Sequence, residues 1–362
     1  MSLQVTKTNL DIEAEIIKTL SQTQYACSDI KRISGGYINF TYRGHVLCPL
    51  SDGSTSVIIK HGEEYSPEIQ NISVSTIRCE AEHSMIQRIN RTCLQHVVYS
   101  NASVRVPHVY QFFPECNTQV MEDFKDSKSL RAALRFLSMS SAASIGQGLG
   151  EWLASFHSWA RAQGDTGLPT VIRGNSELYD MQVRYICHEI LRECESERVS
   201  QYCREKLLGL DKEDVGVVHG DFTSRNILIQ NFHVKDSQPI NLAIVDWEVC
   251  HYGNQSRDVA GFIASIYMAH HFDDVDVADR MLQAFIQGYG LLSEEQAFRI
   301  VVETGICFFL WHVYTDGKQT EKQVKDLLQL AHCLLVKGCE KDWEWIEHSF
   351  LGCLLAGAAG DW

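Results

Sequence analysis

The 362-residue sequence is rich in apolar residues and carries a large excess of acidic ones. With 45% hydrophobic residues and only six prolines, it is neither a disordered nor a fibrous chain. Its 46 acidic and 32 basic residues give a net charge of −14, which disfavours nucleic acid and anionic membrane surfaces as partners, since both attract basic proteins. A chain of this length also exceeds the usual size of one hydrophobic core, so we expect two lobes.

The N-terminal segment predicts an amphipathic helix and not a secretory signal. It contains Asp11, Glu13 and Glu15 and lacks a basic stretch followed by an apolar one. Residues 351–357 form the most apolar late stretch but are too few to cross a bilayer. The thirteen cysteines are scattered, without a Cys-x-x-Cys pair, which is typical of thiols that stay reduced. We therefore expect a cytoplasmic protein without membrane association.

The first third of the chain predicts a strand-rich region. Residues 31–43 and 56–61 combine β-branched and aromatic side chains with neighbouring turn formers, a pattern that is typical of strands. Residues 78–89 then favour a helix, and residues 104–113 and 119–121 favour further short strands. The N-terminal part should therefore form a small, mainly β lobe.

From about residue 127 the hydrophobic pattern becomes helical. Leu149, Trp152, Leu153 and Phe156 recur at the spacing of one buried helix face. We therefore expect a larger helical lobe, joined to the first by a short link.

Three short β segments, at residues 215–218, 227–230 and 242–245, interrupt these helices as a small β island. Further along, Ser293 and Gln296 form a capping box that predicts the start of another helix. The overall pattern is that of an α+β protein.

The strongest chemical signal lies between the first two of these β segments. Asp221 and Asn226 stand five residues apart on a tight loop, so that both side chains can face one point. The carboxylate can accept a proton from a substrate hydroxyl, and the amide oxygen can bind a divalent cation. Asp246, in an Asp-Trp-Glu run that ends at Glu248, adds an anionic group at a strand end. Converging oxygens of this kind are what Mg²⁺ bound to nucleotide phosphates requires.

A glycine turn lies upstream, in the predicted hairpin of residues 31–43. Gly35 and Gly36 form the turn, and Asn39 follows shortly after. Because glycines allow backbone N–H groups to approach an anion closely, the turn is a candidate phosphate-binding loop. An ordinary hairpin turn is the alternative interpretation.

Lys60 ends an otherwise apolar strand, where an unpaired lysine would be costly. The following helix offers Glu82 as a partner, with Glu80 as the alternative. A lysine held by such a carboxylate is suited to direct its ammonium group at nucleotide phosphates.

The order of these motifs resembles that of the aminoglycoside phosphotransferase and choline kinase family, which has a protein-kinase-like fold. The His219-Gly220-Asp221 opening and the Leu-Ala-Ser-Phe-His run at residues 153–157 carry the resemblance, which spans nearly the whole chain. Residues 31–43, 58–61 and 246–253 further resemble the fungal 4-hydroxytryptamine kinases and, more distantly, the methylthioribose kinases.

The resemblance implies a bilobal α+β fold with a small β-rich N-lobe and a larger helical C-lobe. Residues 1–120 would form the N-lobe and bind the nucleotide phosphates. Residues 121–126 would be the hinge, and residues 127–362 the C-lobe that carries catalytic and substrate-binding groups.

The resemblance also implies roles for individual residues. Asp221 would be the catalytic base, and Asn226 and Asp246 would bind Mg²⁺, with Glu248 as an extra metal or substrate contact. Lys60, oriented by Glu82, would hold the α- and β-phosphates. The other implied nucleotide-binding residues are Gly35, Gly36 and Asn39 over the phosphates and Met121, Glu122, Asp123 and Phe124 at the adenine.

The implied activity is the transfer of the γ-phosphate of ATP, with Mg²⁺, to a hydroxyl group of a small molecule. Hydroxytryptamine, methylthioribose, choline-like amino alcohols and aminoglycosides all remain candidate acceptors, and the oligomeric state stays open. No Ala-Pro-Glu activation segment follows Asp246, which argues against a protein substrate. A nucleotide-binding pseudokinase scaffold is the rival hypothesis, although a scaffold does not need Lys60, Asp221, Asn226 and Asp246 together.

Overall fold

An antiparallel five-stranded sheet forms the N-terminal part of the protein. The computed structural model describes residues 7–33, 38–68, 73–99, 101–164, 169–207, 215–230, 240–312 and 319–355. In order across this sheet, the strands are β1 (Cys27–Arg32), β2 (Phe40–Val46), β3 (Ser56–His61), β7 (Thr118–Glu122) and β6 (Val109–Phe113). The predicted strands at residues 56–61 and 119–121 are thereby confirmed, and β3 lies at the centre of the sheet with Lys60 near its end.

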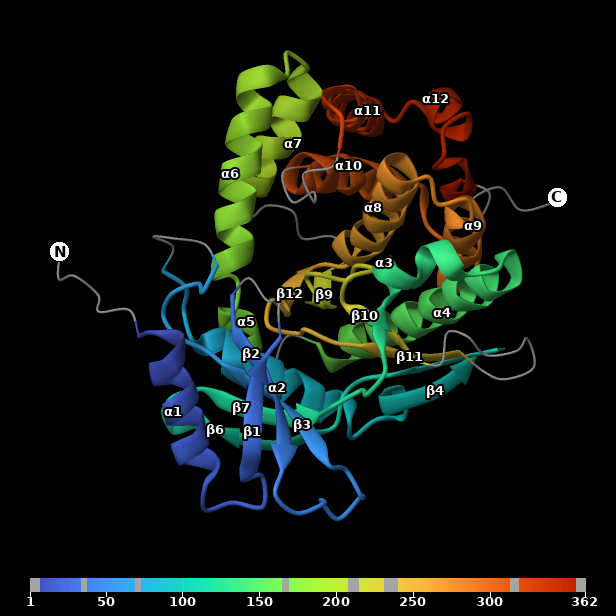
Figure 1. Cartoon of the computed structure of the whole chain (residues 1–362). Helices are drawn as coiled ribbons and strands as arrows, with labels where there is room; N and C mark the ends of the chain where they lie inside the picture. Colours follow the sequence, from blue (N-terminus) through green and yellow to red (C-terminus); the bar gives the residue numbers. More distant parts are fainter. Residues whose placement is uncertain are drawn as a thin grey trace, which may run out of the picture.

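Helix α1 (Asn9–Leu20) covers part of this sheet (Figure 1). It begins with a capping box in which Asp11 N–H donates to Thr8 and the Asp11 carboxylate accepts from the Thr8 N–H. Ile12, Ile16 and Leu20, spaced four residues apart, are buried in one apolar cluster with side chains of the sheet. The predicted amphipathic N-terminal helix is therefore confirmed, and burial of its apolar stripe is what stabilises it on the sheet.

A second five-stranded sheet connects the two parts of the chain. Its strands, in order, are β4 (His96–Tyr99), β5 (Ala102–Arg105), β11 (Ile240–Ile244), β10 (Ile227–Gln230) and β8 (Lys128–Ser129). β11 runs parallel to β5, pairing Ile240 with Ala102. The three predicted β segments are confirmed as strands, but they do not form one island, because β5 pairs with the backbone edge that β11 would otherwise expose. The remaining strands, β9 (Val215–Val218) and β12 (His251–Asn254), pair with each other.

The helices of the C-terminal part pack on one side of these sheets, and α6 and α7 extend away from them side by side (Figure 1). In the N-terminal part, α1 is followed by a further long helix, α2 (Ile77–Ile89). The longer helices of the C-terminal part are α4 (Met139–Gln163), α6 (Glu177–Glu193), α7 (Glu197–Leu207), α8 (Ser256–Asp273), α9 (Ala278–Tyr289), α10 (Glu294–Trp311) and α11 (Glu321–Glu340). The short helical segments are α3 (Leu130–Ala133), α5 (Thr170–Gly174), α12 (Trp343–Glu347) and single 3₁₀ turns at Cys93–Gln95, Pro114–Cys116, Leu134–Phe136 and Gly352–Leu354. The predicted Ser293 capping box opens α10.

Helices α4 and α9 approach each other closely because α4 presents glycines at the crossing. A Cβ atom at Gly146 would lie 2.3 Å from the Met281 carbonyl oxygen, and one at Gly150 would lie 2.1 Å from that of Phe285. Only glycine permits this backbone contact. The predicted buried face of α4, including Trp152 and Phe156, lies in the same large apolar core.

The α6–α7 pair is joined to α10 by a buried ionic cluster. Glu303, on α10, is fully buried and accepts hydrogen bonds from Lys206 and, at 2.7 Å, from the Tyr202 hydroxyl. Arg257, on α8, lies 3.9 Å from its other oxygen. Burial alone would raise the pKa of Glu303, but Lys206 and Arg257 lower it below its usual value. The carboxylate is therefore ionised and compensates two buried cations.

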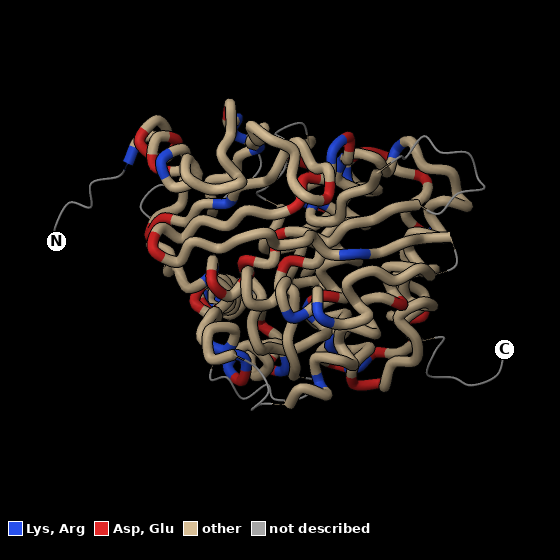
Figure 2. Tube along the Cα trace, turned by 90° about the horizontal axis from the view of Figure 1, so that it is seen from below, with Lys and Arg blue, Asp and Glu red and all other residues tan. Residues whose placement is uncertain are grey.

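The charged residues on the described surface are of both signs. In the view of Figure 2, Lys and Arg are interspersed with Asp and Glu along the trace. No helix in the described part of the chain is long and apolar enough to cross a membrane.

We predict that Glu303→Leu lowers the free energy of unfolding by about 3–5 kcal/mol, because it leaves Lys206 buried without its carboxylate. The double variant Lys206→Met/Glu303→Leu should regain part of this loss, since it removes the closer buried cation together with the carboxylate and leaves Arg257 in place. Asp326→Ala, which breaks the exposed pair between Lys322 and Asp326, is the control and should cost about 0.5 kcal/mol or less. Urea unfolding of the four proteins provides the comparison, and a loss at Glu303 no larger than that of the control would contradict this account.

Candidate active site

The loop between β9 and β10 brings Asp221 and Asn226 together as predicted. The Asn226 Nδ2 donates to Asp221 Oδ2 at 2.7 Å and to the Asp221 carbonyl oxygen at 3.1 Å. Burial and the nearby carboxylate of Asp246 raise the pKa of Asp221, while the bond from Asn226 opposes this shift. The loop thus presents an oriented carboxylate with increased basicity, which suits a group that accepts a proton.

A buried carboxylate that the sequence analysis did not identify holds this loop. Asp258, at the start of α8, accepts the backbone N–H groups of His219 and Gly220 at 2.8 and 2.9 Å. His157 on α4 lies 3.2 Å from the same carboxylate, and its other ring nitrogen lies 2.8 Å from the Tyr289 hydroxyl. Although burial opposes it, these bonds lower the pKa of Asp258. Asp258 lies almost 40 residues beyond this loop in the sequence, and no local sequence signal indicates that it contacts the loop.

The His219 ring connects the loop to the segment that carries Asp246. Its Nε2 lies 3.1 Å from the Val245 carbonyl oxygen, which can only accept, so Nε2 carries the proton. Nδ1 is then free to accept the Asp221 N–H at 3.3 Å. The next residue, Gly220, has φ +84°, a left-handed conformation that favours glycine. A Cβ there would lie 2.4 Å from the Val249 carbonyl oxygen, so the loop requires glycine on both grounds.

Lys60 lies at the centre of a cluster of acidic side chains. Its Nζ lies 2.9 Å from Glu82 and 2.5 Å from Asp246, and Glu248 follows at 3.6 Å. The partner on α2 is therefore Glu82, whereas Glu80 is exposed. The same Glu82 oxygen accepts the Trp247 N–H at 3.1 Å, which ties α2 to the Asp-Trp-Glu segment.

The backbone of this segment is locally unusual at Asp246, whose φ is +70°. Left-handed conformations are uncommon for residues other than glycine, although aspartate tolerates them better than most. Such conformations recur where a side chain must be aimed at a site. Here the conformation directs the Asp246 carboxylate towards Lys60.

When all three are ionised, the carboxylates of the cluster carry more negative charge than Lys60 compensates. One ammonium group faces the three carboxylates of Glu82, Asp246 and Glu248. Although burial opposes it, the three carboxylates raise the pKa of Lys60, which stays charged. Burial and Asp246 raise the pKa of Glu248 to about 8, against the effect of Lys60 and Arg78. Burial likewise raises the pKa of Glu82. An added divalent cation would remove this excess, and its oxygen donors are present.

Asn39 approaches the same cluster from the N-terminal sheet. Its Nδ2 donates to Glu248 Oε2, so a residue at the start of β2 contacts the Asp-Trp-Glu segment. Gly35 and Gly36, the predicted phosphate-binding turn, lie outside the described residues.

The predicted adenine-binding segment has its side chains engaged elsewhere. Glu122 pairs with Arg105 at 2.8 Å, and its backbone N–H donates to the His108 carbonyl oxygen. Asp123 accepts from Arg43 at 2.8 Å and from the hydroxyl group of a β3 serine. These contacts fix the segment, so contacts with a base would have to use its backbone.

The Met121 side chain, on β7, is buried in the large core. The Phe124 ring is also buried and lies under the Arg105 guanidinium, 4.5 Å from its centre. Both residues therefore anchor the ends of the same segment.

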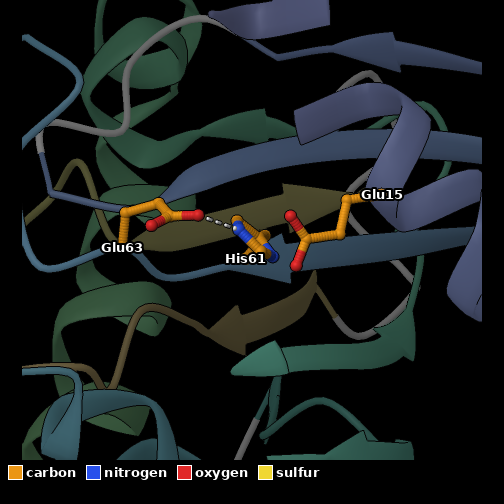
Figure 3. Close-up of side chains that lie close together, drawn as sticks. All are labelled: Glu15, His61 and Glu63. Atoms are coloured by element: carbon orange, nitrogen blue, oxygen red, sulfur yellow. Dashed lines mark hydrogen bonds and ion pairs between the residues drawn. The ribbon is translucent and has the colours of Figure 1, made fainter. Parts of the chain in front are cut away.

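A second group of potential metal ligands has a different explanation. Glu15, His61 and Glu63 converge between α1 and β3 (Figure 3). The Lys7 ammonium lies 2.7 Å from Glu15 and 2.6 Å from Glu63, so it already compensates both carboxylates. His61 contacts Glu63 at 3.0 Å and Thr118 at 2.9 Å. We interpret the group as an ionic contact that fixes α1 on the sheet.

Known proteins support the interpretation of this geometry. Residues 80–300 match the phosphotransferase enzyme family, and the chain belongs to this family. Phosphotransferase FrzJ of Cladobotryum sp is 30% identical over 371 residues, which cover 94% of this chain and 95% of that protein. The 4-hydroxytryptamine kinase of Psilocybe cubensis is 25% identical over 311 residues, which cover 82% of this chain and 84% of that one.

A solved structure shares the fold. Amicoumacin kinase hAmiN, in complex with AMP-PNP, Ca²⁺ and Ami, aligns with a TM-score of 0.53 at 14% identity, covering 91% of this chain and 96% of that one. The predicted family, the α+β fold with a β-rich N-terminal and a helical C-terminal part, and the prediction of a small-molecule phosphotransferase are confirmed.

We predict that Gly220→Ala lowers the turnover number by about 100-fold, since its Cβ would displace the loop that carries Asp221. The matched control is Gly53→Ala. Gly53 has nearly the same φ, +83°, but no atom lies within 4 Å of its added Cβ. The control should lose about 1 kcal/mol of stability from backbone strain and keep its turnover. Equal turnover in both variants, measured on folded protein, would show that the contact with Val249 is not needed.

Proposed function

We propose that this chain transfers the γ-phosphate of ATP to a hydroxyl group of a small molecule. The observation that carries the proposal is the partly buried Asp221 carboxylate, which accepts from Asn226 and whose pKa is raised by burial and by Asp246, the residue that pairs with Lys60. A base, two metal-binding oxygens and an ammonium group thus converge from separate segments. Phosphoryl transfer depends on this combination, because positioning and charge compensation supply most of its catalysis.

In this mechanism Asp221 accepts the proton of the acceptor hydroxyl as its oxygen attacks the γ-phosphorus. The bond from that phosphorus to the bridging oxygen breaks, and ADP leaves. Lys60 moves from Asp246 to the α- and β-phosphates, while Glu82 keeps its stem oriented. Asp258 keeps the backbone that precedes Asp221 in place throughout.

The remaining assignments complete the nucleotide site. Asn39 and the Gly35–Gly36 turn would cover the phosphates, and the backbone of Met121, Glu122, Asp123 and Phe124 would contact the adenine. The fixed side chains of Glu122 and Asp123 support this role, because a rigid backbone offers hydrogen-bonding groups at little entropic cost.

We further propose that Mg²⁺ is the metal. The amide oxygen of Asn226 and the carboxylates of Asp246 and Glu248 would hold it, and these are the hard oxygen donors that this ion prefers. When bound, it supplies positive charge to the phosphate oxygens. The unbalanced negative charge around Lys60 supports this assignment.

As the acceptor class we propose a hydroxylated amine similar to hydroxytryptamine. The support is the 4-hydroxytryptamine kinase that resembles most of the chain, together with a net charge of −14, which attracts cationic molecules. Methylthioribose, choline-like amino alcohols and aminoglycosides are the alternatives.

We propose residues 1–120 as the phosphate-binding lobe, residues 121–126 as the hinge, and residues 127–362 as the catalytic and substrate-binding lobe. A cytoplasmic location, where ATP is abundant and thiols stay reduced, completes the proposal. The rival function is a pseudokinase scaffold. A scaffold would need neither the raised pKa of Asp221 nor the hydrogen bond by which Asp258 holds the preceding backbone.

We predict that Asp221→Asn abolishes phosphate transfer and leaves the affinity for ATP within about twofold, because the amide cannot accept the proton. The assay follows labelled γ-phosphate from ATP, with Mg²⁺, to 4-hydroxytryptamine, methylthioribose, choline, homoserine and an aminoglycoside. Asp326→Asn, on the exposed face of α11, is the control and should keep full activity.

Label on 4-hydroxytryptamine in the wild type and the control, and on no acceptor in Asp221→Asn, supports both the role and the acceptor class. Transfer by Asp221→Asn at the wild-type rate would remove Asp221 as the base. ATP binding without transfer to any alcohol would favour the scaffold.

A further inference from the structure

Arg78 is a fully buried cation at the start of α2 that the mechanism above does not use. Only 1% of its surface is exposed. Its guanidinium donates to the carbonyl oxygens of Val74, Ser75, Ile38 and Glu63, and its Nε donates to Asn39 Oδ1 at 3.1 Å. None of these five acceptors is a carboxylate. A buried charge without an ionic partner is costly unless its hydrogen bonds are satisfied. The five hydrogen bonds of Arg78 meet this requirement, and we therefore ask which residues they position.

The contact with Asn39 determines which way that amide faces. An arginine Nε can only donate, so the Asn39 atom that faces it must be the oxygen. The Asn39 Nδ2 is therefore turned towards Glu248, to which it donates. Arg78, Asn39 and Glu248 thus form a continuous chain of hydrogen bonds from α2 to the Asp-Trp-Glu segment.

This chain of hydrogen bonds packs closely against Gly62. A Cβ at Gly62 would lie 3.1 Å from Asn39 Oδ1, 3.3 Å from an Arg78 terminal nitrogen and 2.2 Å from Cys79 Sγ. Arg78 also donates to the Ile38 carbonyl oxygen at 3.2 Å, so it holds both Asn39 and the residue that precedes it.

We propose that Arg78 is a positioning residue for the proposed metal site, because through Asn39 it orients Glu248 for the metal. This inference rests on the proposed function, because it assigns Glu248 to the metal. An arginine is needed, since its planar group donates in several fixed directions at once, whereas a lysine donates from one point.

The test is isothermal titration of ADP into the full chain, once with Mg²⁺ and once with EDTA. The informative quantity is the dissociation constant in EDTA divided by that in Mg²⁺. This ratio measures how much the metal contributes to nucleotide binding. We expect Arg78→Met to lower this ratio at least tenfold and Arg78→Lys to give an intermediate value. Arg91→Met, the same substitution at an exposed arginine just beyond α2, should leave the ratio unchanged.

A double-mutant cycle isolates the path through Asn39. Asn39→Leu keeps the four bonds from Arg78 to backbone carbonyls and should lower the ratio on its own. Adding Arg78→Met to it should lower the ratio little further, because residues that act through one network are not additive. If Arg78→Met does not fold, the ratio in Asn39→Leu decides the matter.

A lower melting temperature with an unchanged ratio in Arg78→Met, or an unchanged ratio in Asn39→Leu, would overturn the proposal and leave Arg78 a purely structural role. Wild-type protein that binds ADP in neither condition would instead contradict the proposed function itself.

Discussion

The ion pairs of Lys60 are the interaction on which the site depends. They join the central strand of the N-terminal sheet to Glu82 on α2 and to Asp246 and Glu248 in the C-terminal part. A buried ammonium group without these partners would cost several kcal/mol, so the three segments are held in one arrangement. Since the carboxylates outnumber the ammonium group, their full ionisation requires further positive charge. The same contacts fix the junction of the two parts, and under the proposed function a metal bound to phosphate supplies that charge.

A separate buried network positions the catalytic loop. Asp258 accepts two backbone N–H groups from the loop and contacts His157, and the His219 ring reaches the Val245 carbonyl oxygen. The backbone preceding Asp221 is therefore held by α8, and the strand end before Asp246 is held by the loop. The geometry between Asp221 and Asp246 is consequently set by hydrogen bonds among buried groups, which are expensive to break.

Much of this could be predicted from sequence because it depends on local patterns. Three features are each encoded within a few residues: the apolar run that ends at Lys60, the helix that carries Glu82, and the five-residue spacing of Asp221 and Asn226. These patterns also decide which side of a strand or helix a side chain occupies.

The rest could not be predicted because it depends on contacts between distant segments. The parallel pairing of β5 with β11 joins residues about 140 apart, and no periodicity in either segment specifies it. Asp258 and Arg78 were likewise not recognised as part of the site. Most of their hydrogen-bond partners are backbone atoms. Every residue has the same backbone groups, so the sequence does not indicate which of them a buried side chain will contact.

A crystal structure with a non-hydrolysable ATP analogue and Mg²⁺ tests the central claim most directly. The account predicts that the Lys60 ammonium leaves Asp246 for the phosphate oxygens and keeps its contact with Glu82. Oxygens of Asn226 and Asp246 should then ligate the metal. A bound nucleotide with the pair between Lys60 and Asp246 intact, and with the metal held by other residues, would contradict it.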